Sequence, residues 1–91
     1  MTAPDDRPAC LRYWAAAKAA AGVAEEHVRA SNLAEALREV QGRHDERFAA
    51  VLRRCSYLVD GDPVGVREHA LVELRGGSVV EVLPPFAGGC R

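Results

Sequence analysis

Apolar residues recur at helical spacing in the middle of the chain, at positions i, i+3, i+4 and i+7 of one segment. The residues that share this spacing are Leu33, Ala36, Leu37 and Val40. Asn32 precedes them as an N-cap residue type, and Glu35 follows three positions later, as in a capping box. The pattern therefore predicts a main helix between Asn32 and Gly42, with one apolar stripe that must lie against a sheet.

Two shorter segments also have helical patterns. Ala15 to Ala21 is almost pure alanine and is closed by Gly22, which predicts a short helix with a glycine at its C-terminal end. Asp45 is an N-cap residue type, and the apolar residues after it again follow helical spacing, so a further helical segment is predicted. Its apolar positions are Phe48, Val51, Leu52 and Cys55.

Short runs of aromatic and aliphatic residues predict strands on both sides of the main helix. Before it, Cys10 to Trp14 forms the first strand, and Glu25 to Ala30 is a more polar candidate for an edge strand. After it, Tyr57 to Val59 ends at Asp60-Gly61, a pair that suits a tight turn.

Residues 64–74 are expected as extended chain or loop. Gly76-Gly77 then turns the chain into a closing strand from Ser78 to Leu83. With two strands before the main helix and at least two after it, the order favours an α+β fold, a mixed sheet with that helix packed across one face. We expect a flexible N-terminus at residues 1–9, one domain at 10–83 and a flexible C-terminal tail at 84–91.

The end of the chain combines prolines with glycines. Pro84 and Pro85 end the last strand because proline supplies no backbone N–H and restricts the residue before it. At ~3.3 Å per residue, the arm from Pro84 to Gly89 reaches roughly 20 Å, enough to enter a deep site on another protein. Gly88 and Gly89 make that arm thin. The structural alternative is a frayed terminus of small residues.

Composition and charge give no indication of two common classes of binding partner, nucleic acids and membranes. Twelve basic and thirteen acidic residues are interspersed and leave a formal charge of −1, which implies neither nucleic acid nor an anionic membrane as a partner. No apolar run approaches ~20 residues and no signal peptide is recognised, so we expect a cytoplasmic protein that is a monomer when free. Cys10, Cys55 and Cys90 are widely spaced, which suggests neither a disulfide framework nor a zinc site.

Other candidate chemistry is weaker. His27, His44 and His69 fall on separate predicted elements without close acidic or cysteine partners, and we assign no metal ligand. Cys10 and Cys55 occupy apolar-patterned positions and are expected to behave as small buried hydrophobic residues.

The aromatic residues divide into two groups. Tyr13, Trp14 and Phe48 are expected in the core. Phe86 stands on the terminal arm, where a large apolar side chain suits a pocket of a partner protein.

Four motifs occur in the chain in an order that is known from one family. They are Tyr13-Trp14-Ala15-Ala16-Ala17, Asn32-Leu33-Ala34-Glu35, Leu58-Val59-Asp60-Gly61 and Leu83-Pro84-Pro85-Phe86-Ala87-Gly88-Gly89. With these motifs the chain resembles the MoaD/ThiS sulfur carriers from about Cys10 to Gly89. The resemblance implies the β-grasp fold of ubiquitin-like proteins.

The same resemblance implies a protein that is a substrate rather than an enzyme and that binds no cofactor itself. The Gly89 carboxylate would be activated with ATP by an E1-like adenylating enzyme, converted to a thiocarboxylate and used to deliver sulfur to a biosynthetic enzyme. Gly88 and the tail residues before it would enter the partner sites. Those tail residues are Pro84, Pro85, Phe86 and Ala87.

The chain departs from the usual ending of the family, because Cys90 and Arg91 follow Gly89. Some relatives bear a short extension that a JAMM-type zinc peptidase removes, so the resemblance implies that Cys90-Arg91 is removed before activation. The other interpretation is a cloning scar or an inert tail.

Two further function classes stay open. One is a ubiquitin-like modifier joined through Gly89 to lysines of target proteins; Lys18, the only lysine, would then be the single site for linking copies of the modifier. The other is an enzyme with Cys90 as a thiol nucleophile, although a tail cysteine lacks the fixed base that such thiols need. For a sulfur carrier, molybdopterin, thiamine, cysteine and a secondary metabolite all stay open as the product that receives the sulfur.

Overall fold

A computed structural model describes residues 7–85, and the predictions for residues 1–6 and 86–91 lie outside that range. The elements in chain order are β1 (Ala9–Tyr13), α1 (Ala15–Ala21), β2 (Glu25–Val28), α2 (Leu33–Gln41), α3 (Glu46–Leu52), β3 (Ser56–Val59), β4 (Asp62–Pro63), the 3₁₀ helix η1 (His69–Leu71) and β5 (Val79–Leu83). The predicted helices and strands all form. The ends of the strands differ from the prediction by up to two residues.

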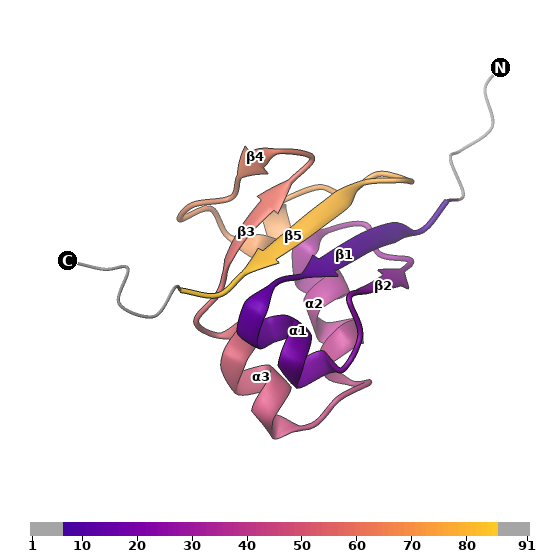
Figure 1. The fold of residues 1–91 in the computed structure, drawn as a ribbon. Coiled ribbons are helices and arrows are strands. Elements are labelled where there is room, and N and C mark those ends of the chain that lie inside the picture. The colour runs from indigo at the N-terminus through magenta and orange to yellow at the C-terminus, as the bar shows by residue number, and fades with distance from the viewer. Residues whose placement is uncertain (1–6, 86–91) are drawn as a thin grey trace, which may run out of the picture.

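The five strands form one mixed sheet in the order β2-β1-β5-β3-β4. The central pair, β1 and β5, is parallel, whereas all the other neighbours are antiparallel. β2 lies at one edge of the sheet, as its polar sequence predicts. In Figure 1 the sheet lies in front and the helices lie behind and below it, which confirms the predicted α+β arrangement.

The helix starts are fixed by the side chains that the sequence indicates. The Asn32 side chain accepts a hydrogen bond from the Glu35 backbone N–H at 2.9 Å, and Asp45 accepts one from the Phe48 N–H at 3.2 Å. The Glu35 carboxylate in turn accepts from the backbone N–H and the hydroxyl of Ser31, at 3.0 and 2.9 Å. These contacts satisfy N–H groups that have no partner within their own helix. The hydrogen bonds from Ser31 also lower the pKa of Glu35, because they favour its charged form.

Two connections depend on positive φ angles. Gly22 ends α1 in the left-handed conformation, with φ at 79°. Asp60 and Gly61, at φ 50° and 89°, form the tight turn between β3 and β4. All three φ values lie in the region that asparagine, aspartate and glycine tolerate best, which explains why the sequence signal at these positions was correct.

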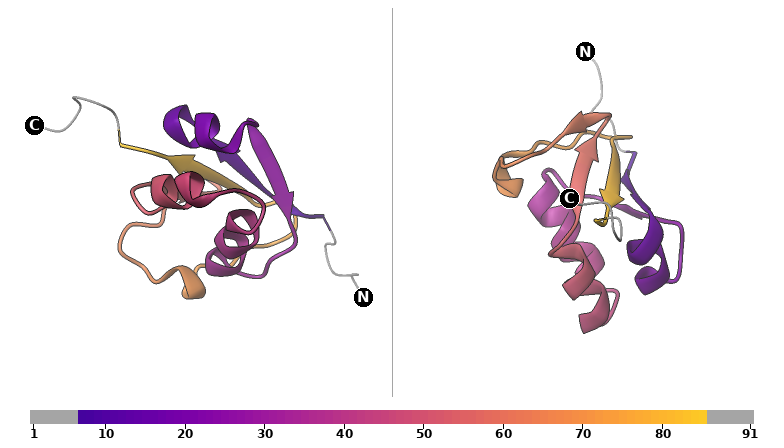
Figure 2. Two further views of the ribbon diagram at one scale, coloured as in Figure 1. Left: turned by 90° about the horizontal axis from the view of Figure 1, so that it is seen from below. Right: turned by 60° about the vertical axis from the view of Figure 1, so that its left-hand side comes forward.

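One hydrophobic core lies between the sheet and the helices, and Figure 2 shows the helices gathered along the sheet from two further directions. Its fully buried large side chains are Phe48, Leu11, Leu33, Val40, Val80 and Val82. The loop at residues 64–74, expected as extended chain or loop, contains the short helix η1 and adds Val64, Val72 and Leu74 to the core. Within residues 7–85, no helix is long and apolar enough to cross a membrane.

Candidate functional site

The base of the C-terminal arm is built on β5. This strand pairs with β1 on one side and β3 on the other, and its Val80 and Val82 side chains are fully buried. A central strand with both edges paired and one face in the core holds its end in a fixed place. The arm therefore starts from a rigid point of the fold.

The structure places the start of the exposed arm at Pro85. Pro84, predicted as the first partner-binding residue, is buried, whereas Pro85 is exposed. Pro84 thus belongs to the packed base of the arm. The other predicted site residues lie outside the described part of the chain: Phe86, Ala87, Gly88, Gly89, Cys90 and Arg91.

Trp14 lies beside this base, and its predicted place in the core is wrong. Trp14 has 48% of its surface exposed, whereas its neighbour Tyr13 is buried, with 3% exposed. Side chains alternate along β1, so Tyr13 faces the core and the next residue faces outward. The Trp14 backbone N–H donates to the Val82 carbonyl at 3.3 Å, which holds the Trp14 backbone next to the end of β5. The following residue, Ala15, has φ at 49°, a conformation that non-glycine residues rarely adopt.

A network of polar side chains around Glu26 fixes β2 to the segment between α2 and α3. Tyr13 Oη donates to Glu26 Oε2 at 3.0 Å, and Arg43 Nη1 donates to Oε1 at 3.2 Å. The imidazole Nε2 of His44 contacts the same carboxylate. Burial acts to raise the pKa of Glu26, but hydrogen bonds from His44, Arg43 and Tyr13 outweigh it and lower that pKa. His44 therefore has an acidic partner, Glu26, although the sequence analysis expected none.

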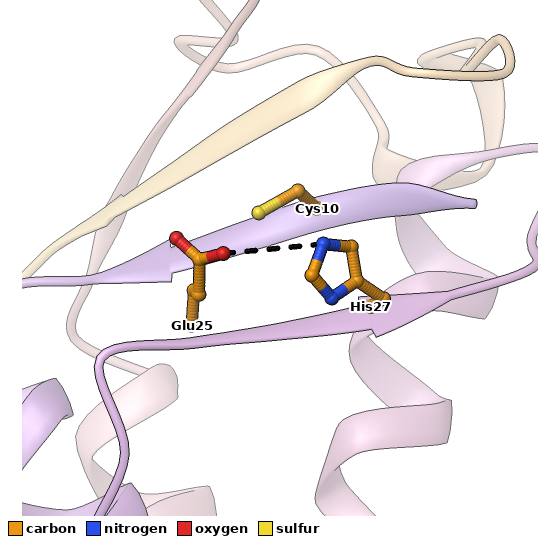
Figure 3. Close-up of side chains that lie close together, drawn as sticks. All are labelled: Cys10, Glu25 and His27. Atoms are coloured by element: carbon orange, nitrogen blue, oxygen red, sulfur yellow. Dashed lines mark ion pairs between the residues drawn. The ribbon is translucent and has the colours of Figure 1, made fainter. Parts of the chain in front are cut away.

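The other two histidines also have partners in the fold. His27 Nε2 lies 3.9 Å from Glu25 Oε2, and Cys10 Sγ lies close to both (Figure 3). His69 packs its ring edge-on against Tyr57, with ring centroids 5.3 Å apart. The premise that the histidines lack close acidic or cysteine partners is thus wrong for His27 and His44. Sheet pairing brings Cys10 to His27, and a loop crossing brings His44 to Glu26, so neither contact appears as a short spacing in the sequence. Glu25, in contrast, stands only two residues before His27.

The described thiols are not prepared for nucleophilic attack. Cys55 Sγ donates to the Val51 carbonyl at 3.3 Å, and burial raises the pKa of that thiol to about 11. Burial, followed by the nearby Glu25 charge, also raises the pKa of Cys10. Both cysteines are half-buried rather than fully buried. A nucleophilic thiol needs the opposite shift, toward the thiolate.

The model of the ThiS family matches residues 11–89 of the chain. The chain belongs to the ThiS family. Members of this family are small carrier proteins rather than enzymes. The match of this ThiS-family chain ends at Gly89, so Cys90 and Arg91 lie beyond it. A comparison with curated protein sequences gives no match.

Solved structures share the fold of this ThiS-family chain. The small archaeal modifier protein 1 from Methanosarcina acetivorans superposes with a TM-score of 0.76 at 16% identity, over 91% of this chain and 97% of that one. A putative molybdopterin converting factor subunit 1 from Pyrococcus furiosus gives 0.72 at 24% identity, over 89% and 100%. The complex of subunits 1 and 2 of the molybdopterin-converting factor from Helicobacter pylori gives 0.64 at 22%, over 89% and 97%. These similarities confirm the predicted β-grasp fold.

Proposed function

We propose that this ThiS-family protein is a cytoplasmic sulfur carrier whose reacting group is the Gly89 carboxylate. The observation that carries the proposal is the family match, which runs to Gly89. The structure supports it through β5, a fixed central strand that leads directly into the arm. From Pro85 to Gly89 a fully extended chain spans at most about 17 Å, enough to place the carboxylate inside a partner.

The proposed chemistry needs no catalytic residue on this chain. A carboxylate is a poor electrophile, so an E1-like enzyme joins the Gly89 carboxylate oxygen to the α-phosphate of ATP and pyrophosphate leaves. Hydrosulfide then attacks the acyl carbon of the adenylate, the bond to AMP breaks, and AMP leaves, so that Gly89 carries a thiocarboxylate. The activating partner supplies the ATP site and the electrostatic stabilisation.

The thiocarboxylate then delivers its sulfur to a biosynthetic enzyme. The Helicobacter pylori structure contains a complex of the two subunits of a molybdopterin-converting factor, and we infer a synthase-like partner of this kind for the present chain. Pro85, Phe86, Ala87 and Gly88 would enter that partner. Trp14, exposed next to the base of the arm, adds an aromatic contact outside the channel.

Removal of Cys90 and Arg91 comes first in this scheme. While the Gly89 carbonyl is part of a peptide bond, it has no anionic oxygen to attack ATP. The Arg91 carboxylate lies two residues further on, a displacement of roughly 7 Å along an extended chain. Since misplacement by ~1 Å can cost ~10²-fold in rate, the longer chain should be a poor substrate. A JAMM-type zinc peptidase is the proposed processing enzyme.

The experiment compares two forms of the protein with a cognate E1-like enzyme. The form that ends at Gly89 should support exchange of labelled pyrophosphate into ATP, and the form that ends at Arg91 should not. If both forms react equally fast, Cys90-Arg91 is merely tolerated. If neither form reacts, although the enzyme adenylates a known carrier, the carrier assignment is wrong.

A ubiquitin-like modifier is the second candidate, because the fold is shared with the small archaeal modifier protein 1 and Lys18 is exposed on α1. Both functions begin with adenylation of Gly89, so the pyrophosphate assay cannot separate them. The intact mass of the protein from its native host can. A carrier shows the mass change of an oxygen-to-sulfur exchange, whereas a modifier is recovered joined to lysines of other proteins.

A further inference from the structure

Three side chains with metal-binding atoms gather on the face of the sheet that the helices leave open. Cys10 lies on β1, and Glu25 and His27 lie on β2. The Cys10 Sγ, a Glu25 carboxylate oxygen and a ring nitrogen of His27 all lie within 4.8 Å of one another. Figure 3 shows the three side chains turned toward a common point between the two strands.

The backbone fixes this arrangement. Cys10 is directly paired with His27 in the antiparallel ladder, so their side chains leave the sheet on the same face. Glu25 is two residues before His27 on the same strand, and a period of two returns its side chain to that face. Because sheet register sets all three directions, the cluster does not depend on the conformation of a loop.

The contacts within the cluster leave its ligand atoms available. Glu25 forms two long ion pairs, with His27 Nε2 at 3.9 Å and with Arg12 Nε at 3.9 Å, and its carboxylate also interacts with the Cys10 thiol. Both Glu25 and His27 have about half of their side-chain surface exposed, so small rotations are open to them. Cys10 is half-buried beneath them. The set thus has one shielded sulfur and two adjustable ligands.

The chemistry of the donors selects the ion. A thiolate, an imidazole and a carboxylate are the ligands of Zn²⁺, whereas Mg²⁺ and Ca²⁺ prefer oxygen alone. With bonds of ~2.0–2.3 Å, the ligand atoms of tetrahedral zinc lie roughly 3.3–3.8 Å apart. The present separations need to shorten by only about 1 Å, which side-chain rotation supplies without moving the strands.

We propose that Cys10, Glu25 and His27 form a Zn²⁺ site on the open face of the sheet, with water as the fourth ligand. As the zinc–sulfur bond forms, the Cys10 thiol loses its proton to solvent. The thiolate and the Glu25 carboxylate together balance the two charges of the ion, and His27 binds as the neutral ring. The site lies on β1 and β2 and is separate from the C-terminal arm at the end of β5.

The test is a titration of the reduced full chain with Zn²⁺ against a chelator of known affinity. The wild type should bind one Zn²⁺ per chain. The variants Cys10→Ser, Glu25→Gln and His27→Gln should each weaken binding at least about tenfold, since even outer partners of metal ligands cost that much. The matched controls Cys55→Ser, Cys90→Ser and His69→Gln replace the same residue types outside the cluster and should leave the affinity unchanged.

A second measurement checks that a loss of binding comes from the lost ligand and not from misfolding of the variant. Co²⁺ in place of Zn²⁺ should give the absorption of a tetrahedral site with a thiolate-to-metal band, and that band should disappear in Cys10→Ser. In the wild type, Zn²⁺ should shift the amide signals of β1 and β2. The proposal is overturned if the wild type binds no Zn²⁺, if His27→Gln binds Zn²⁺ with the affinity of the wild type, or if a control variant weakens binding as much as the cluster variants do.

Discussion

The two faces of the sheet share the same strands but have opposite characters. On the inner face, Leu11 and Tyr13 of β1 and Val80 and Val82 of β5 are at most 3% exposed. On the outer face, the alternating residues of the same strands are half-buried or exposed. They are Cys10, Arg12, Val79, Glu81 and Leu83. The inner face provides stability, and the outer face is therefore free to carry ligands and contacts for partners.

The largest predicted effect comes from a cavity on the inner face. Leu11→Ala should lower the free energy of unfolding by ~2–5 kcal/mol, because the fully buried side chain leaves a void against the helices. The matched outer-face variant is Arg12→Ala on the adjacent position of the same strand. Its exposed ion pair with Glu25 is long, at 3.9 Å, so the change should stay below ~1 kcal/mol. Denaturant unfolding of both variants measures the contrast, and similar costs would remove the distinction between the faces.

Many features of the fold could be predicted from the sequence, because they depend on residues that are close together in the chain. The spacing that begins at Leu33 and the caps at Asn32 and Asp45 involve residues no more than a few positions apart, and all form as predicted. The Asp60-Gly61 turn is equally local. Each of these signals acts within one turn or one strand, where neighbouring residues alone fix the backbone.

The candidate metal site could not be predicted in the same way. Cys10 and His27 meet because β1 and β2 pair in one register, and the sequence separation gives no sign of it. The contact of His44 with Glu26 likewise needs the path of the chain between α2 and α3. Trp14 is different, since the alternation of side chains from Leu11 onward already predicts that its side chain lies outside the core. Its aromatic character led to the wrong assignment.

The second predicted effect concerns Glu26, the polar residue that the edge strand β2 places on the otherwise apolar inner face of the sheet. Glu26 receives hydrogen bonds from Tyr13 and Arg43 and contacts His44. Glu26→Gln keeps the size of the side chain but removes its charge, and should cost about 1–2 kcal/mol at neutral pH. The measurement is denaturant unfolding of the variant beside the wild type.

The sign of the pH dependence follows from the lowered pKa of Glu26. A carboxyl whose pKa is lower in the folded state contributes its stability above its unfolded value, near 4.5, and loses it as the pH falls through the folded pKa. The contribution of the Glu26 charge to the difference between wild type and Glu26→Gln should therefore be fully present above that value and shrink below it. A difference that grows on acidification would contradict the network.

The third predicted effect is smaller and tests a hydrogen bond inside the core. Tyr57 Oη donates to the Leu52 carbonyl at 2.8 Å, and the Cys55 backbone N–H donates to the same oxygen at 3.1 Å. Tyr57→Phe removes one of two donors, so the carbonyl keeps a partner and the cost should be only about 1 kcal/mol. A thermal or denaturant melt measures it. A loss as large as that of Leu11→Ala would show that the ring itself has moved.

The smallest effect on stability belongs to the outer face, at Trp14. Its side chain is half exposed, and its hydrogen bond to Val82 comes from the backbone, so Trp14→Ala should change the free energy of unfolding by less than ~1 kcal/mol. Activation should respond differently if the indole contacts the E1-like enzyme at the base of the arm. With the form ending at Gly89, we expect kcat/KM for pyrophosphate exchange to fall about tenfold. The control is Leu71→Ala, which removes another exposed apolar side chain, 80% exposed on η1. Equal activation of wild type and Trp14→Ala would restrict the recognition surface to the arm itself.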